Sequence, residues 1–192
     1  MPLNLPNILT LGRIALIPVF AVVFFLPFGW ANVAAAVIFA LAAVTDWLDG
    51  YLARRMGLTS AFGAFLDPVA DKLMVAVALV ALLTVNSTPL FALAAAVIIG
   101  REIAVSALRE WMAELGKRAK VAVNAIGKFK TAAQMVAILL LIHAEPIAGV
   151  PVYHLGMVLL FVAAGLTLWS MVVYLQAALA VIREEERAAG KA

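Results

Sequence analysis

Four aspartates between Asp46 and Asp71 are the side chains of this sequence best suited to chemistry. Asp46 and Asp49 are three residues apart, which places them on one face of a helix. Asp67 and Asp71 are four apart, with the same result. No basic residue lies three or four positions from any of them. Like charges this close on apolar helices are unfavourable unless a cation lies among them, and the simplest candidate is a divalent metal held by oxygen ligands.

The cations that could bind an anion include Arg101, Arg109, Lys128 and Lys130, none of which has an acidic residue three or four positions away. Arg101 lies within an apolar run, and Arg109 follows about 80° round the helix and about 12 Å along it. This pair could line one wall of a cavity and bind an anion. Two structural alternatives stay open. Arg101 could pair with a carboxylate of another helix, and the two lysines could extend to the membrane interface.

The composition is that of an integral membrane protein. Hydrophobic residues make up 66% of the 192 and charged residues 13%, whereas about a quarter are charged in soluble domains. Several apolar runs reach the roughly 20 residues that a membrane-spanning helix needs. We therefore predict a single all-α membrane domain over residues 1–192. The absence of cysteine excludes disulfides and thiolate ligands.

Six spans are predicted, at about 13–28, 33–55, 67–85, 89–112, 125–143 and 152–182. Residues 3–12 alternate apolar and polar groups, which favours a short interfacial segment with a helix start at Pro6 and Asn7. Asp67 followed by Pro68 is typical of a helix N-terminus. The sixth segment would be about 46 Å long, so its last turns should project beyond the hydrocarbon core.

The positions of the basic residues predict the topology. All 14 Lys and Arg fall in four zones, at residues 13, 54–72, 101–130 and 183–191, and the alternate connections contain none. The positive-inside rule then places both termini, and the aspartates near them, on the cytoplasmic side. No long basic arm is present that would favour nucleic-acid binding.

Eight positions at fixed spacing identify the sequence as a member of the CDP-alcohol phosphotransferases. They are Asp46, Asp49, Gly50, Ala53, Arg54, Gly63, Asp67 and Asp71. The opening L-P-N-I-L-T-L-G-R, the run R-E-I-A-V-S-A-L-R-E-W-M-A-E-L-G-K-R and the later G-K-F-K-T-A-A-Q-M are similar to the members that use glycerol 3-phosphate. The resemblance covers nearly the whole chain.

This resemblance implies an enzyme that joins CDP-diacylglycerol to glycerol 3-phosphate and releases CMP. It also implies a homodimer among membrane lipids, in a bacterial inner membrane, with its active site on the cytoplasmic side. Two divalent cations, Mg²⁺ or Mn²⁺, would serve the reaction, because a diphosphate repels an incoming oxygen until its charge is neutralised.

The resemblance also assigns roles to residues. Asp46, Asp49 and Asp67 would ligate metal, and Asp71 would both ligate metal and take the proton of the attacking hydroxyl. The CDP moiety would contact Asp49, Gly50, Ala53, Arg54 and Gly63. Small residues also serve plain helix packing, which is the alternative for three of these. The acceptor phosphate would bind Arg101, Arg109, Lys128 and Lys130.

Two rival functions remain open from the sequence. Another acceptor, such as an inositol phosphate or phosphatidylglycerol, would leave the signature unchanged. A transporter of divalent cations or anions would also place acids within a membrane. The clustering of the acids toward one face, without a visible inverted repeat, disfavours the transporter.

Overall fold

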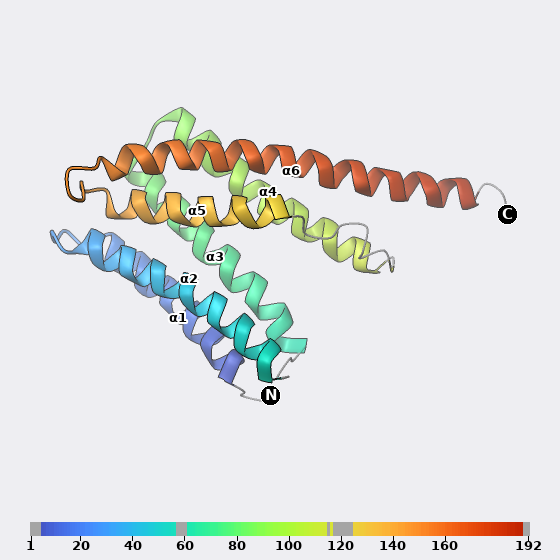
Figure 1. Cartoon of the computed structure of the whole chain (residues 1–192), viewed down its shortest axis with the longest axis horizontal. Helices are drawn as coiled ribbons and strands as arrows, with labels where there is room; N and C mark the ends of the chain where they lie inside the picture. The colour runs from blue at the N-terminus through green and yellow to red at the C-terminus, as the bar shows by residue number, and fades with distance from the viewer. Residues whose placement is uncertain (1–4, 57–60, 115, 117–124, 190–192) are drawn as a thin grey trace.

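The computed structural model describes residues 5–56, 61–114, 116 and 125–189 (Figure 1). Its helices are α1 Leu5–Phe24, α2 Ala31–Met56, α3 Ala61–Val85, α4 Pro89–Glu114, α5 Ala125–His143 and α6 Val152–Ala189. No strand occurs in the described ranges, where pairing of β type is confined to one bridge between Ile147 and Val150. The predicted all-α class is confirmed.

The helices are those of a membrane protein. Five of them are long and apolar enough to cross a membrane, and α5 contains a shorter apolar stretch, Lys130–His143. With 19 residues, α5 is about 28 Å long, close to the thickness of a hydrocarbon core. Large apolar side chains such as Trp47 and Trp169 are each 67% exposed, as expected for surfaces that face lipid.

The helix start predicted at Pro6 and Asn7 is confirmed to within two residues, since α1 begins at Leu5. It runs without a break to Phe24, so residues 5–12 are the first turns of the same helix as the predicted first span. Pro6 lies in the first turn, where a missing N–H costs nothing. The polar residues Asn7, Thr10 and Arg13 recur every three positions and are all buried. Their spacing therefore marks the buried face of one helix. The helix ends at Phe24, four residues before the predicted limit of Phe28.

The predicted N-cap at Asp67 is wrong. Helix α3 begins at Ala61, and Pro68 lies inside it. A proline within a helix removes one hydrogen bond to the carbonyl four residues earlier, a cost that packing can offset. Asp67 lies within the helix, and its carboxylate accepts a hydrogen bond from Thr10 of α1.

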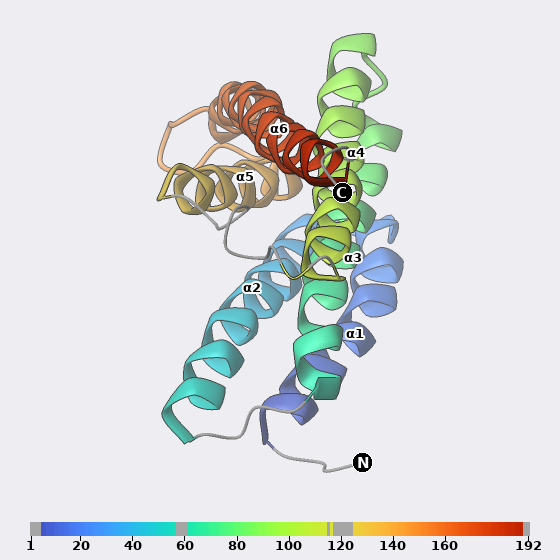
Figure 2. The same cartoon turned by 90° about the vertical axis from the view of Figure 1, so that its right-hand side faces the viewer.

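The helices pack in neighbouring pairs around an alanine-rich core (Figures 1 and 2). Helix α1 packs on α2 and α3, α5 packs on α6 and α2, and α4 packs on α6 and α3. Small buried residues such as Ala35, Ala42 and Ala78 let the backbones approach closely, and Phe20 and Phe39 fill the wider gaps. This arrangement brings the ends of α2 and α3 toward α4, α5 and α6, around one cavity.

Candidate active site

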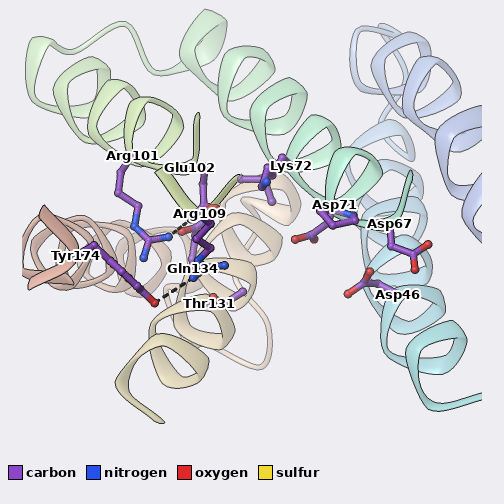
Figure 3. Close-up of a pocket in the computed structure, with 12 residues that line it drawn as sticks. Asp46, Asp67, Asp71, Lys72, Arg101, Glu102, Arg109, Thr131, Gln134 and Tyr174 are labelled. Atoms are coloured by element: carbon purple, nitrogen blue, oxygen red, sulfur yellow. Dashed lines mark hydrogen bonds and ion pairs between the residues drawn. The ribbon is translucent and has the colours of Figure 1, made fainter. Parts of the chain in front are cut away.

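A cavity of about 370 Å³ joins the two sets of charged residues that the sequence singled out (Figure 3). Its acidic end consists of Asp46 of α2 and Asp67 and Asp71 of α3. Its basic end is formed by Arg101 and Arg109 of α4, with Glu102 beside them. The other lining residues include Lys72, Thr131, Gln134 and Tyr174. In Figure 3 the Asp71 carboxylate points toward the basic end.

Arg13 of α1 lies among the aspartates. Its Nη1 donates to Asp46 Oδ1 at 2.7 Å, and its Nη2 donates to Asp49 Oδ2. The side chains of Arg13 and Asp49 are 1% and 2% exposed. One guanidinium therefore bridges both acids of α2, and it is the cation that like charges on an apolar helix require.

Thr10 extends the same contact surface of α1. Its hydroxyl donates to Asp67 Oδ1 and also lies 3.4 Å from Asp49 Oδ2. Sequence reasoning treated Arg13 as a topology signal and did not assign Thr10. The signal that could have found them is the three-residue spacing of Asn7, Thr10 and Arg13 in an otherwise apolar helix.

The acidic end suits a divalent cation in its chemistry. Four carboxylates supply only oxygen donors, and one guanidinium offsets one of their charges in direct ion pairs. Within the described ranges, however, no three acidic or histidine side chains are grouped closely enough to hold a metal ion. The Arg13 guanidinium and the Thr10 hydroxyl contact three of the carboxylates in this arrangement.

At the basic end, Glu102 holds two cations. Arg101 Nη1 donates to Glu102 Oε1 at 2.9 Å, and Lys130 Nζ of α5 donates to the same oxygen at 3.0 Å. Lys130 is 1% exposed and is not part of the described cavity lining, so it acts on the cavity through Glu102. Arg101 Nη2 also donates to Ser170 of α6 at 3.1 Å. Sequence reasoning looked for acids at helical spacing and so missed Glu102, the direct neighbour of Arg101.

Tyr174 of α6 lies against both arginines. The guanidinium carbons of Arg101 and Arg109 are 5.5 and 5.2 Å from the centre of its ring, and Arg109 Nη2 donates to its hydroxyl at 3.0 Å. An aromatic face attracts cations and so offsets part of the repulsion between two guanidinium groups. Tyr174 was also missed, although Thr167, Ser170 and Tyr174 form a polar stripe on α6.

The remaining predicted residues are placed as follows. Gly50 lies in α2 and Gly63 is buried in α3, and the described cavity lining includes neither. The side chains of Ala53, Arg54 and Lys128 lie outside those that the structure describes. The structure therefore brings together three aspartates and two arginines along one cavity, with Asp49 joined to them through Arg13.

Carboxylates and paired arginines along one cavity, within membrane helices, define a membrane protein suited to a phosphorylated substrate. The sequence model of the CDP-alcohol phosphatidyltransferase family matches residues 3–181, and the chain belongs to that family. It is 55% identical over 185 residues to the CDP-diacylglycerol–glycerol-3-phosphate 3-phosphatidyltransferase of Escherichia coli (strain K12), covering 96% of this chain and 100% of the relative. A protein of the same name from Salmonella typhimurium is 56% identical over 178 residues, covering 93% and 96%.

Proposed function

We propose that this chain transfers the phosphatidyl group of CDP-diacylglycerol to glycerol 3-phosphate, giving phosphatidylglycerophosphate and CMP in phospholipid biosynthesis. The observation that carries the proposal is the single cavity with aspartates at one end and arginines at the other. The names of relatives that are 55–56% identical over most of the chain support the same reaction.

The basic end is assigned to the phosphate of the acceptor. Arg101, Arg109 and Lys130 contribute three positive charges and Glu102 removes one, which leaves two. A phosphate monoester carries a charge of about −2 at neutral pH, so the two charges match. The planar guanidinium groups of the arginines can each bind two phosphate oxygens. Lys128 is included in this proposal on the family signature alone.

The acidic end is assigned to two divalent cations, Mg²⁺ or Mn²⁺, held by Asp46, Asp49, Asp67 and Asp71. When bound, such cations neutralise a diphosphate and stabilise a leaving phosphate. Ligation by both acids of α2 requires the Arg13 guanidinium to release at least one of them.

Asp71 is assigned as the base. The acceptor hydroxyl forms a bond to the phosphorus of the phosphatidyl group, the bond from that phosphorus to the CMP oxygen breaks, and the hydroxyl proton moves to Asp71. The direction of the Asp71 carboxylate in Figure 3, toward the end that would hold the acceptor, supports this role. Asp49, Gly50, Ala53, Arg54 and Gly63 are assigned to the CDP moiety.

The proposal includes a cellular setting. The enzyme would be a homodimer in the bacterial inner membrane, with both termini and the cavity on the cytoplasmic side. This placement lets the acyl chains of one substrate remain in hydrocarbon while glycerol 3-phosphate and CMP exchange with water. The distribution of Lys and Arg along the chain supports the orientation.

The test measures CMP release by the purified protein in detergent with CDP-diacylglycerol, Mg²⁺ and glycerol 3-phosphate. We expect release to stop in Asp71→Asn and to persist in Glu110→Gln, an exposed acid of α4. Competition by inositol phosphate or phosphatidylglycerol would point to another acceptor. Metal-dependent flux across vesicles without CMP release would contradict the proposal and favour a transporter.

A further inference from the structure

Gln134 of α5 is a buried amide that lines the cavity. Its side chain is 3% exposed, and its Oε1 accepts no hydrogen bond from any described residue. Buried polar groups in proteins are nearly always paired, and an unpaired one in a cavity points to a ligand that supplies the missing group. A leucine would fill this position without leaving a polar atom unpaired.

Gln134 shares the cavity with residues that the proposed reaction uses. It is one helical turn beyond Lys130, whose Nζ reaches Glu102 at the basic end. Gln134, both arginines and Asp71 line the same cavity, and Figure 3 draws Gln134 next to Arg109. A molecule bound by the arginines at one end and close to Asp71 at the other would occupy the cavity that the Gln134 amide lines.

Glycerol 3-phosphate has the matching order of groups. Its phosphate is on one terminal carbon, the attacking hydroxyl is on the other, and a second hydroxyl lies on the carbon between them. With the phosphate at Arg101 and Arg109 and the attacking oxygen toward Asp71, the middle hydroxyl would lie in the same cavity that the Gln134 amide lines. A hydroxyl both donates and accepts, so it satisfies the amide in either orientation of its O and N atoms.

We propose that Gln134 binds the non-reacting hydroxyl of the acceptor and thereby selects a three-carbon diol phosphate. This inference rests on the proposed function and adds to it the residue that recognises the substrate between its two ends. Selection of this kind works because an acceptor without the hydroxyl leaves the amide unpaired in the complex.

The experiment compares two acceptors, glycerol 3-phosphate and 3-hydroxypropyl phosphate, which lacks only the middle hydroxyl. In the unaltered protein we expect kcat/KM to favour glycerol 3-phosphate by on the order of tenfold or more. In Gln134→Leu the preference should fall to about twofold or less, with the loss confined to glycerol 3-phosphate and the KM for CDP-diacylglycerol unchanged. Gln176→Leu, the same change at an exposed position of α6, should keep the full preference.

An equal loss with both acceptors in Gln134→Leu, leaving the preference intact, would overturn the inference and assign Gln134 a packing role. Gln134→Asn provides a second variant that keeps the amide but withdraws it by one methylene, and it should also lose the preference. Absence of CMP release from the unaltered protein with glycerol 3-phosphate is a different result. It would refute the proposed function itself.

Discussion

At the scale of single residues, the acidic end depends on one arginine. Arg13 bridges Asp46 and Asp49 from a neighbouring helix and is almost fully buried. A guanidinium can serve two carboxylates at once because its donors lie in a planar fork, which an ammonium lacks. Breaking a buried ion pair by removing one partner leaves an uncompensated charge, which is strongly destabilising.

Arg13→Gln is therefore expected to lower the free energy of unfolding by about 3–5 kcal/mol in the absence of divalent ions. Arg13→Lys should lower the free energy of unfolding by less than Arg13→Gln does. It should still be less stable than the unaltered protein, because a single ammonium cannot bond both carboxylates in the same geometry. Thermal unfolding in detergent measures both changes. Arg55→Gln, at an exposed arginine of the same region whose partner is the Tyr51 hydroxyl, should change stability by about 0.5 kcal/mol or less. Equal stability of the two glutamine variants would contradict the prediction.

Tyr174 should affect the affinity for the acceptor. Tyr174→Phe keeps the ring under both guanidinium groups but removes the hydroxyl that accepts from Arg109, so the KM for glycerol 3-phosphate should rise about fivefold. Tyr174→Leu also removes the ring and should raise it on the order of twentyfold. The KM for CDP-diacylglycerol should stay unchanged in steady-state assays of CMP release. Trp169→Leu, at an exposed position of α6, is the control. A parallel rise of both KM values would contradict this role.

The aspartates and arginines of the site could be predicted from the sequence, because each is anomalous within its own apolar segment. Their partners could not. Arg13 meets Asp46 across 33 positions and Tyr174 meets Arg109 across 65, and no local pattern encodes such contacts. The same limit led us to attribute the missing cation to metal alone.

At the scale of elements, α5 and α6 are in close contact at Gly156. A Cβ added there would lie 3.0 Å from Leu141 Cγ, 3.1 Å from Leu140 Cβ and 3.2 Å from the Ala137 carbonyl oxygen. Contacts this short cannot be relieved by one flexible side chain, because a backbone atom is among them. The glycine therefore fixes the distance between the two helices.

Gly156→Ala is expected to destabilise the protein by about 1–3 kcal/mol, because the two helices must separate to admit the methyl group. Gly165→Ala is the matched control, since it lies on the same helix and an added Cβ there meets nothing within 4 Å. That change should be neutral or stabilise by about 0.5–1 kcal/mol. Thermal unfolding of both variants in the same detergent gives the comparison. A Gly156→Ala variant as stable as Gly165→Ala would contradict the close approach.

The predicted helix limits agree with the structure for some helices and not for others. The bounds of α5, residues 125–143, and the start of α4 at Pro89 are as predicted. The first span was drawn from residue 13 although the helix begins at Leu5, beside the start signal at Pro6. The start of α3 lies six residues before Asp67, because Pro68 was read as a helix boundary. Tertiary packing kept both helices continuous through polar residues that face the site.

At the scale of the whole molecule, the described ranges form six helices, and charged groups from several of them line one cavity. Helix α6 has 38 residues and is about 57 Å long, so it exceeds a hydrocarbon core of about 30 Å. The all-helical membrane class could be predicted from composition and length alone. The orientation in the membrane rests on the basic residues and can be tested directly.

Because the chain has no cysteine, one introduced thiol reports on one position. Ser87, two residues before α4, and Glu114, the last residue of α4, are both exposed. With the proposed orientation, Ser87→Cys should react with a membrane-impermeant maleimide in intact spheroplasts, and Glu114→Cys should react only in inverted vesicles. The unaltered protein, which should not label, is the control. The reverse pattern would place the cavity on the other side of the membrane.

The ion pairs of Arg13 have a consequence for biosynthesis. The first helix leaves the ribosome with an arginine in its apolar segment, and its counter-charges at Asp46 and Asp49 are made more than 30 residues later. A lone arginine within a bilayer is costly, and so are the two acids without it. We therefore expect α1 and α2 to enter the bilayer from the translocon together, as a helical hairpin whose Arg13 is already paired with Asp46 and Asp49.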